Sequence, residues 1–289
     1  MSEQRPTINI IGAGRLGTTL GWLLCQRQLA TIHTVCNRTL ASAERATSFI
    51  GEGHAVASIE TMPYADITII TTSDADIKPC FDRIPYLSDQ TIVLHCSAML
   101  SAQQLQSAVA PCCSIHPMQS FNYPCKTQNP LDQCFCAIEG DKRALKQVTP
   151  LFTALGAHTF PLSSQQKTRY HLAGVMASNF LVTLNALAHE QLVHAEIDPS
   201  IARPLLDRIM QQTLTNLKNS TTPVEALTGP IARGEYETIQ KHIQTLNDPQ
   251  VSECYRALSQ ATLAIAKLDA PIKQRLHALL CHSHDAEST

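Results

Sequence analysis

The segment INIIGAGRLGTTLGWLL near the start of the chain restricts the possible folds more than any other. A β-rich run leads directly into Gly12-Ala-Gly14-Arg-Leu-Gly17, and a helix is predicted to follow from Leu16 to Gln28. In such a strand–turn–helix unit the glycines allow a tight turn, close approach of a pyrophosphate and close packing of helix on strand. The helix N-terminus also attracts phosphate groups. We therefore predict a dinucleotide site that includes Gly12, Gly14, Arg15, Leu16 and Gly17.

The first half of the chain alternates β-rich runs with helical segments, and the second half is helical throughout. Strands are expected at 7–12, 30–37, 54–58, 65–72, 90–97, 112–118, 134–140 and 157–162, and helices at 16–28, 39–50 and 142–155. After Ser163, helices are expected at 165–196, 199–219, 234–246, 249–268 and 271–281. This order predicts an α/β domain with a mostly parallel, doubly wound sheet at 1–162, followed by an all-α domain at 163–289.

The end of the second strand indicates which dinucleotide is bound. An enzyme that uses NAD usually has an acidic residue there, about 20 residues after the glycines, which binds the ribose hydroxyls. This chain has VCNRT instead, with Asn37, Arg38 and Thr39 and no acid. A guanidinium is suited to a 2′-phosphate, so the sequence favours NADP(H). The alternative is that Arg38 is a solvated residue near a helix start.

Polar residues recur where the later strands end. In a parallel sheet, ligands bind beyond the carboxyl ends of the strands. Thr72 and Ser73 follow one strand, and His95 and Ser97 follow the next, so we expect them along the ribose and nicotinamide. The segment SIHPMQSF is expected to reach the nicotinamide or the substrate through His116, Gln119 and Ser120. Taken singly, each of these polar residues is as well explained by a local turn or cap.

Composition excludes several classes of protein. The net charge is −2 and neither sign forms a long run, which argues against a nucleic-acid or anionic-membrane surface. The apolar segment YHLAGVMASNFLVTLNALAHE is interrupted by polar residues and is interpreted as a buried core helix rather than a membrane span. Eleven cysteines without an export signal predict a reduced, cytoplasmic protein. Their spacings do not predict a metal site, and the tail CHSHD is read as a solvated end.

Five motifs resemble those of a known bacterial family: GAGRLG, NRT, SIHPMQSF, YHLAGVMASNF and ALTGPIARGEYETIQKHIQTL. Together they resemble the two-domain family of the DUF2520 type, which combines a Rossmann-like domain with a helical domain. The resemblance covers nearly the whole chain. It implies kinship with 6-phosphogluconate dehydrogenase-like enzymes, pyrroline-5-carboxylate reductase and ketopantoate reductase. In that group the helical domain closes the nicotinamide site and often builds a homodimer. Some family members are an alternative class of ketopantoate reductase, which serves pantothenate biosynthesis.

The resemblance also suggests what the polar residues of the apolar helix do. On a regular helix His171, Val175, Ser178 and Val182 share one face, with Asn179 beside it. His171, Ser178 and Asn179 are therefore candidate catalytic residues. The related β-hydroxyacid dehydrogenases place a lysine four residues before the asparagine, where this chain has Val175, so that lysine is absent. Lys167, one turn before His171, is a rival acid if it is desolvated. The alternative is a core helix whose polar residues bond to backbone.

These observations predict hydride transfer from NADPH to the carbonyl carbon of a small 2-oxo acid, with ketopantoate as the best candidate implied by the resemblance. His116 or His171 is the expected general acid, since the histidine pKa of about 6.5 suits that role. Arg233, after the turn Thr228-Gly229-Pro230, is expected to bind the substrate carboxylate, unless it pairs with a surface acid or caps a helix. The alternatives are an imine reductase of the pyrroline-5-carboxylate reductase type and a non-catalytic NADP-binding sensor.

Overall fold

The computed structural model describes residues 5–105, 107 and 109–281. The end of the chain beyond Cys281, including most of the CHSHD tail, lies outside the described residues. Its contacts group the chain into two compact units, residues 1–180 and 181–289. This division falls later in the chain than the expected domain boundary after residue 162, because the first unit retains the helix that follows the last strand. Each unit is described by itself below.

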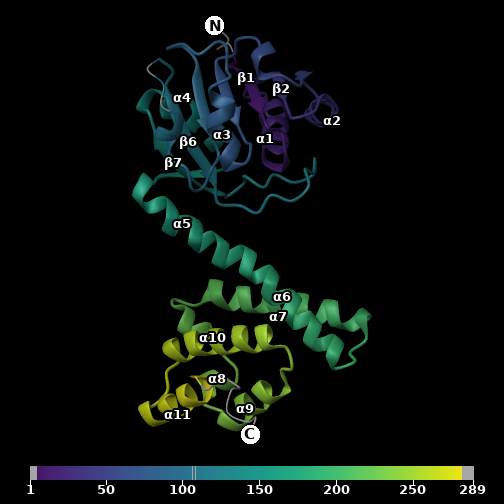
Figure 1. Ribbon diagram of the computed structural model, residues 1–289, viewed down its shortest axis with the longest axis vertical. Helices are drawn as coiled ribbons and strands as arrows, with labels where there is room; N and C mark the ends of the chain where they lie inside the picture. The colour runs from purple at the N-terminus through teal and green to yellow at the C-terminus, as the bar shows by residue number, and fades with distance from the viewer. Residues whose placement is uncertain (1–4, 106, 108, 282–289) are drawn as a thin grey trace. The chain divides into compact units, whose positions relative to one another are not determined.

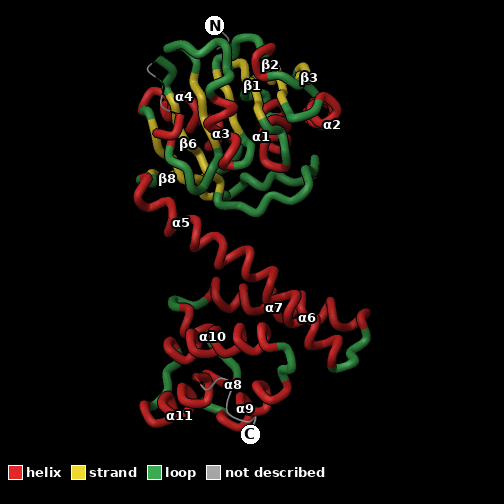
Figure 2. The backbone as a smooth tube through the Cα atoms, viewed as in Figure 1, coloured by secondary structure: helices red, strands yellow, loops and turns green. Residues whose placement is uncertain are grey.

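The first unit is built on one sheet of eight strands (Figures 1 and 2). The spatial order is β3-β2-β1-β4-β5-β6-β7-β8, and every neighbouring pair is parallel except β6 and β7. The mostly parallel sheet predicted from the sequence is confirmed. The strands are β1 Thr7–Ile11, β2 Thr31–Cys36, β3 His54–Val56, β4 Ile67–Ile70, β5 Ile92–His95, β6 Cys112–Pro117, β7 Phe135–Gly140 and β8 His158–Pro161.

Helices cover both faces of the sheet. Successive side chains of a strand point to opposite faces, and the two buried clusters separate accordingly. Ile8 and Ile10 pack with helices α1 and α4, whereas Ile11 packs with helix α3 on the other face. The same alternation repeats along β4 and β5. The helices are α1 Arg15–Gln26, α2 Leu40–Ile50, α3 Asp74–Phe81 and α4 Lys142–Ala154, with short 3₁₀ turns at Ile59–Thr61, Ala102–Leu105 and Ser164–Gln166. The sheet is therefore doubly wound, as predicted.

Local signals explain where several of these helices begin. The Thr39 side chain accepts a hydrogen bond from the Ser42 N–H and caps α2. Asp141 accepts from the N–H groups of Arg143 and Ala144 and caps α4. Helix α3 was not predicted, because its sequence DADIKPCF buries only Ile77 and Phe81 and carries a proline. Two apolar contacts in eight residues give too weak a periodicity to recognise.

The apolar segment forms α5 Lys167–Gly174, a π-helical turn Val175–Asn179 and α6 Phe180–His194. Interpreting it as a buried core helix was wrong for the described chain: α6 has no buried residue, and Met176 and Val182 are 59% and 71% exposed. Its apolar residues spread around the helix, so one neighbouring layer cannot cover them. By length and composition, Ser164–His194 is the one helical stretch among the described residues that meets the criteria for a membrane span, which is weak evidence on its own.

The second unit is all-α, as predicted. After α6 it contains α7 Pro199–Asn219, α8 Pro230–Arg233, α9 Tyr236–Thr245, α10 Pro249–Ile265 and α11 Ala270–Cys281, with a 3₁₀ turn at Pro223–Ala226. A small core joins the last three helices through Ile239, Ile243, Leu263, Leu276 and Leu280. Asp198 and Asp248 cap α7 and α10. Gly234, expected to begin a helix, instead ends α8 in a left-handed conformation with φ of 73°.

Candidate nucleotide and active site

The glycine turn has the geometry that its sequence predicts. Gly12 has a φ of 84°, and a Cβ there would lie 2.5 Å from the Thr72 methyl group. A Cβ at Gly17 would overlap the Thr71 hydroxyl, which donates to the Gly12 carbonyl over 2.8 Å. Gly14 begins α1 without a side-chain cap, and a Cβ there would meet only the Gly12 carbonyl, 3.9 Å away. The turn therefore leaves room above Gly14 at an uncapped helix N-terminus, where a pyrophosphate can bind.

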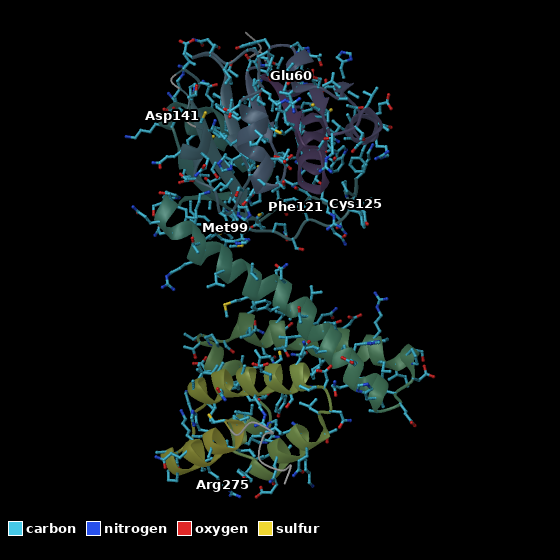
Figure 3. All side chains as sticks on the ribbon, in the orientation of Figure 1. Glu60, Met99, Phe121, Cys125, Asp141 and Arg275 are labelled. Carbon is cyan, nitrogen blue, oxygen red and sulfur yellow. The ribbon has the colours of Figure 1, made fainter. Side chains whose placement is uncertain are left out.

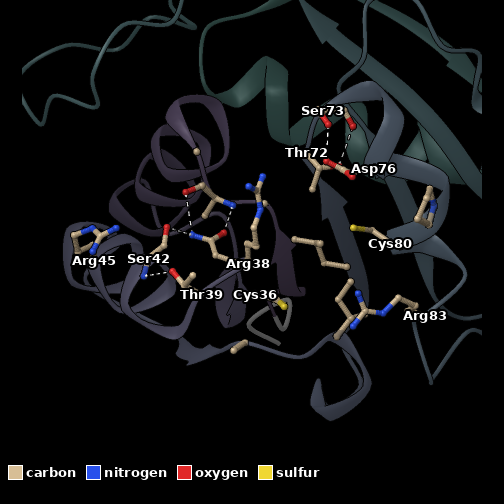
Figure 4. A pocket seen from close by; sticks show the side chains of 18 residues that line it. Cys36, Arg38, Thr39, Ser42, Arg45, Thr72, Ser73, Asp76, Cys80 and Arg83 are labelled. Atoms are coloured by element: carbon tan, nitrogen blue, oxygen red, sulfur yellow. Dashed lines mark hydrogen bonds between the residues drawn. The ribbon is translucent and has the colours of Figure 1, made fainter.

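A cavity of about 870 Å³ opens beside this turn (Figure 4). It is lined by the glycine turn, the end of β2, the start of α2 and the segment from Thr72 to Arg83. Three arginines line it: Arg38, Arg45 and Arg83. Arg38 and Arg45 are exposed, whereas Arg83 is already bound to Glu60 by bonds of 2.7 and 3.0 Å. Arg38 and Arg45 thus leave a cationic rim available to a phosphate.

Sequence analysis missed Arg45 and Ser42, both of which line this cavity. Both lie in the first two turns of α2, directly after Thr39. Residues three or four apart share one face of a helix, so Thr39, Ser42 and Arg45 follow one another at a helical spacing of three. The spacing of three residues after NRT could therefore have predicted Ser42 and Arg45 as part of the site.

Asn37 supports the glycine turn rather than offering a free amide to a ligand. Its side-chain oxygen accepts a 2.6 Å hydrogen bond from the Ala13 N–H, and its amide donates to the Ser42 hydroxyl over 3.1 Å. Ser73 and Thr72 also line the cavity, but both hydroxyls already have local partners. Ser73 donates to Asp76 over 2.5 Å, and Thr72 donates to the Ser73 carbonyl. For Thr72 and Ser73 the structure shows the local bonding that was the alternative to ligand contact.

Arg15 is exposed in the first turn of α1, where its guanidinium lies 5.1 Å from the centre of the Tyr123 ring. Tyr123 belongs to the long loop after β6, which also carries Gln119 and Ser120. The Gln119 amide donates to the Pro130 carbonyl, and the Ser120 N–H donates to the Gln119 side chain. Met99, Phe121 and Cys125, which follow β5 and β6, lie along the same edge of the unit (Figure 3). Gln119 and Ser120 thus help to shape the loop.

A second polar cluster lies where β5, β6 and β7 meet the first turn of α5. Lys167 is 3% exposed, and its ammonium has three acceptors. It lies 3.1 Å from a Glu139 carboxylate oxygen, 3.0 Å from the Ser114 hydroxyl and 3.3 Å from the Ser97 carbonyl. Burial lowers the pKa of Lys167, while the Glu139 carboxylate opposes that shift. Lys167 was named as a rival acid on condition that it is desolvated, and the structure shows that desolvation.

His116 lies beside this cluster on β6. Its Nδ1 is 3.0 Å from the Tyr170 hydroxyl, and the two rings meet edge to face. Burial lowers the pKa of His116 to about 4, and the positive charge of Lys167 and the neighbouring His171 add to the effect. Burial also raises the pKa of Tyr170. Our expectation of an unperturbed histidine pKa near 6.5 was therefore wrong for His116, because the ring is largely desolvated beside a cation.

His95 is fully buried at the end of β5, so it does not present a surface to the cavity. Its Nδ1 accepts a hydrogen bond from the Ser97 N–H over 3.2 Å, and its Nε2 has no partner in the described residues. Burial lowers its pKa to about 4, with Lys167 as the second cause. The Ser97 hydroxyl accepts from the N–H groups of Met99 and Leu100 and thereby closes the turn after β5. His95 and Ser97 therefore hold the end of β5 and the turn after it in position.

The π-helical turn changes the register that was expected for the apolar helix. A π-turn bonds residue i to i+5 and adds a residue to the turn, so the regular spacing from which His171, Val175, Ser178 and Val182 were placed on one face is interrupted at Val175–Asn179. Ser178 and Asn179 lie inside the turn, and Val182 is 71% exposed. His171, Val175 and Ser178 are all half-buried, and their placement on one face stays a prediction. Isolated π-turns are frequent at functional sites, and this one begins one residue after Gly174, where a Cβ would meet Met118.

Arg233 lies in the second unit, where its Nε bonds to a Glu235 carboxylate oxygen over 2.5 Å. The side chain is 60% exposed, so this is the surface pairing considered as an alternative to substrate binding. Its role toward a carboxylate substrate stays a prediction. Within the described residues, His, Cys, Asp and Glu side chains form no group of three that could hold a metal. All eleven cysteines are free thiols.

Comparisons with known proteins agree with this architecture. Residues 134–262 match the family described as a domain of unknown function, DUF2520. The matched segment covers less than half of the chain. The match spans the end of the first unit and much of the second, and it confirms the resemblance seen in the two motifs YHLAGVMASNF and ALTGPIARGEYETIQKHIQTL. A search of curated proteins found no match.

Solved structures share the fold across most of the chain. A Bacteroides fragilis protein provisionally named an NADP oxidoreductase is 23% identical with a TM-score of 0.78, over 90% of this chain and 98% of its own. The 1-pyrroline-5-carboxylate reductase of Streptococcus pyogenes is 14% identical with a TM-score of 0.61, over 90% and 99%. An Aspergillus terreus reductive aminase in complex with NADPH is 17% identical with a TM-score of 0.57, over 96% and 93%. At these identities the likeness establishes the fold.

Proposed function

We propose that this protein is an NADPH-dependent reductase that acts on a carbonyl group of a small molecule. One observation carries the proposal: a glycine turn at an uncapped helix N-terminus opens onto a cavity with exposed Arg38 and Arg45. The cavity has no carboxylate at the end of β2 to bind the ribose hydroxyls in the manner of an NAD enzyme. Exposed guanidinium groups suit a 2′-phosphate instead. The names of the structural neighbours support the same cofactor.

NADPH, when bound, supplies the hydride. The protein's residues bind the cofactor and provide polar groups beside the substrate. The glycine turn and the N-terminus of α1 bind the pyrophosphate, while Arg38, Thr39, Ser42 and Arg45 bind the 2′-phosphate. Asn37 holds the turn in the required shape through Ala13. With a pKa of about 4, His116 is neutral at physiological pH. It therefore acts as a hydrogen-bond donor to the substrate oxygen rather than as an imidazolium acid.

His171, Ser178 and Asn179 lie on or beside the π-turn and remain the candidates for proton delivery and for orienting the substrate. Arg233 remains the candidate for a substrate carboxylate. Within this proposal the best substrate is a 2-oxo acid, with ketopantoate as the candidate implied by the motifs. A cytoplasmic location fits the eleven free thiols.

Imine reduction is a second candidate, favoured by one specific observation. The fold matches pyrroline-5-carboxylate reductase over 90% of the chain and reductive aminase over 96%. Purified protein incubated with NADPH and, separately, ketopantoate, other 2-oxo acids and pyrroline-5-carboxylate distinguishes the two. Loss of NADPH absorbance with a 2-oxo acid supports the first proposal, and turnover of the imine alone selects the second. Binding of NADPH without turnover across the panel identifies a non-catalytic NADP-binding protein.

We further propose that two copies of the chain associate through the apolar helix and α7. Half or more of the side chain is exposed at Leu172, Met176, Phe180, Val182, Val193, Ile201 and Ile209. Exposed apolar side chains that recur along these helices indicate an interaction surface. Light scattering of wild type is expected to give a dimer, and Val182→Asp with Met176→Asp a monomer. An equally monomeric wild type contradicts the proposal.

A further inference from the structure

The loop after β6 is anchored at both ends and exposed in between. We call residues 119–131 the strap. Near its start Phe121 packs against the apolar core, and at its end Leu131 is fully buried. The Asn129 amide donates to the Leu155 carbonyl over 2.7 Å and ties the strap to the end of α4. The residues between these anchors are mostly exposed, so the course of the strap depends on the few contacts that they make.

Two cation–π contacts join the middle of the strap to helices α1 and α2. The Arg15 guanidinium lies over the Tyr123 ring, 5.1 Å from its centre. The Lys126 ammonium lies over the Phe49 ring, 5.0 Å from its centre. Contacts of this kind at exposed sites contribute little to the stability of a fold, and Tyr123 is still 78% exposed. Stability alone therefore does not account for an aromatic ring placed on the first turn of α1.

Arg15 has the free donors that an anion requires. Within the described part of the chain none of its guanidinium N–H groups has an acceptor, whereas Arg83 donates to Glu60. Arg15 directly follows Gly14, which lines the cavity at the uncapped N-terminus of α1. A positive side chain and a helix N-terminus both favour an anion. In a bound dinucleotide, the anionic group that meets such a glycine turn is the pyrophosphate.

We propose that Tyr123 is a positioning residue of the cofactor site: its ring holds the Arg15 guanidinium beside the glycine turn, where the guanidinium binds the pyrophosphate of NADPH. The ring contact uses the positive charge and leaves the N–H groups available for phosphate oxygens. A long side chain loses rotamer freedom when it binds a ligand, and holding it in advance reduces that loss. The strap consequently moves less once the dinucleotide is bound. This inference rests on the proposed function for the identity of the ligand.

A double-mutant cycle on NADPH affinity tests whether Tyr123 acts through Arg15. Arg15→Met is expected to weaken NADPH binding by about tenfold or more, because a charge-assisted bond to phosphate is lost. Tyr123→Leu is expected to weaken it by about threefold, and Tyr123→Phe, which keeps the ring, to stay close to wild type. In the Arg15→Met background the effect of Tyr123→Leu is expected to disappear. Losses that multiply in the double variant, or tighter binding by Tyr123→Leu, overturn the proposal.

Alkylation of Cys125 follows the strap without any enzymatic turnover. Cys125 and Cys281 are the two exposed thiols of the described chain, and Cys281, at the end of α11, is the internal control. Peptide mass spectrometry measures the rate at each thiol separately. NADPH is expected to slow alkylation of Cys125 severalfold in wild type and much less in Tyr123→Leu, and to leave Cys281 unchanged. Equal rates at Cys125 with and without NADPH in wild type contradict the proposal.

Tyr64→Leu is the matched control for the loss of an exposed tyrosine. Tyr64 is 47% exposed and precedes β4, at the amino end of that strand, so its removal is expected to leave NADPH affinity unchanged. An equal loss of affinity in Tyr64→Leu and Tyr123→Leu contradicts the proposal. NADPH binding with the expected coupling but without turnover of any substrate removes the proposed reductase and leaves this inference standing. Turnover without coupling between Tyr123 and Arg15 does the reverse.

Discussion

Charged side chains are exposed at the β1–β2 end of the sheet and buried at its β5–β7 end. At the first, Arg83 and Glu60 are each 52% exposed at the margin of an open cavity, and Arg38 and Arg45 are exposed beside them. At the second, the side chains of Lys167 and Glu139 are only 4% and 13% exposed and bind each other. Exposed cations remain hydrated and can exchange water for an incoming phosphate at low cost. A buried pair has no such freedom, so its contribution is a fixed local field.

The largest predicted effect comes from removing one member of the buried pair. Lys167→Met leaves the Glu139 carboxylate buried without its cation, and the free energy of unfolding is expected to fall by about 3–5 kcal/mol. Arg83→Met, which breaks the exposed pair with Glu60, is expected to change it little. Denaturant titration of both variants measures the contrast. Equal losses in the two variants would contradict the distinction between the two ends.

A second prediction concerns the stability of the fold at acidic pH. The pKa of fully buried His95 is lowered to about 4, below its unfolded value of about 6.5. Between these values the unfolded chain binds the proton and the folded chain does not, so stability falls as pH falls through this window. The loss is expected to reach about 3 kcal/mol below pH 4. Denaturant titrations from pH 7.5 to 4.5 are expected to show a shallower loss in His95→Gln. A parallel loss in the variant would refute this assignment.

The glycine turn provides a third prediction, which separates binding from folding. Gly14→Ala places a Cβ in open space, 3.9 Å from its nearest neighbour, so the melting temperature is expected to stay near that of wild type. NADPH affinity is expected to fall by about a hundredfold, or about 2.7 kcal/mol, since the methyl group occupies the pyrophosphate position. Gly12→Ala is strained at φ of 84° and crowded by Thr72, so it is expected to lower both the melting temperature and the NADPH affinity. Unchanged affinity in Gly14→Ala would remove the pyrophosphate from this turn.

The smallest predicted effect concerns the cationic rim. Arg38→Gln and Arg45→Gln are each expected to weaken NADPH binding by about tenfold, because each removes one charge-assisted hydrogen bond. NADH, which lacks the 2′-phosphate, is expected to bind all variants alike. Calorimetry with both cofactors makes the comparison, and Lys146→Met is the control for loss of an exposed charge. A parallel loss of NADH affinity would mean that the arginines act on folding or on another part of the dinucleotide.

The two ends also differ in how far the sequence predicts them. The strand–GAGRLG–helix order and the residues NRT are contiguous, so the turn, the strand end and the exposed Arg38 followed from local spacing. The cluster at the other end joins Ser97, Ser114, Glu139 and Lys167 from four separate segments. Only the packing of β5, β6, β7 and α5 brings them together. Lys167 was named as an acid only on condition of its burial, and no local pattern supplies its partner.

Three further differences have local physical causes. Helix α3 escaped notice because Ile77 and Phe81 are its only buried side chains. The π-turn at Val175–Asn179 cannot be read from composition, since the same residues suit an α-helix. The apolar helix was expected in the core because its residues are apolar, yet burial depends on what packs against it, and α6 buries none of its residues within one chain. The pKa of His116 depends in the same way on its neighbours.

The central claim is that the cavity beside the glycine turn binds NADPH through its 2′-phosphate. Calorimetric titration of the purified wild-type protein with NADPH and then with NADH tests this claim most directly. We predict that NADPH binds at least about tenfold more tightly, which corresponds to about 1.4 kcal/mol from the cationic rim. Equal affinity for the two cofactors, or binding of neither, would contradict the claim.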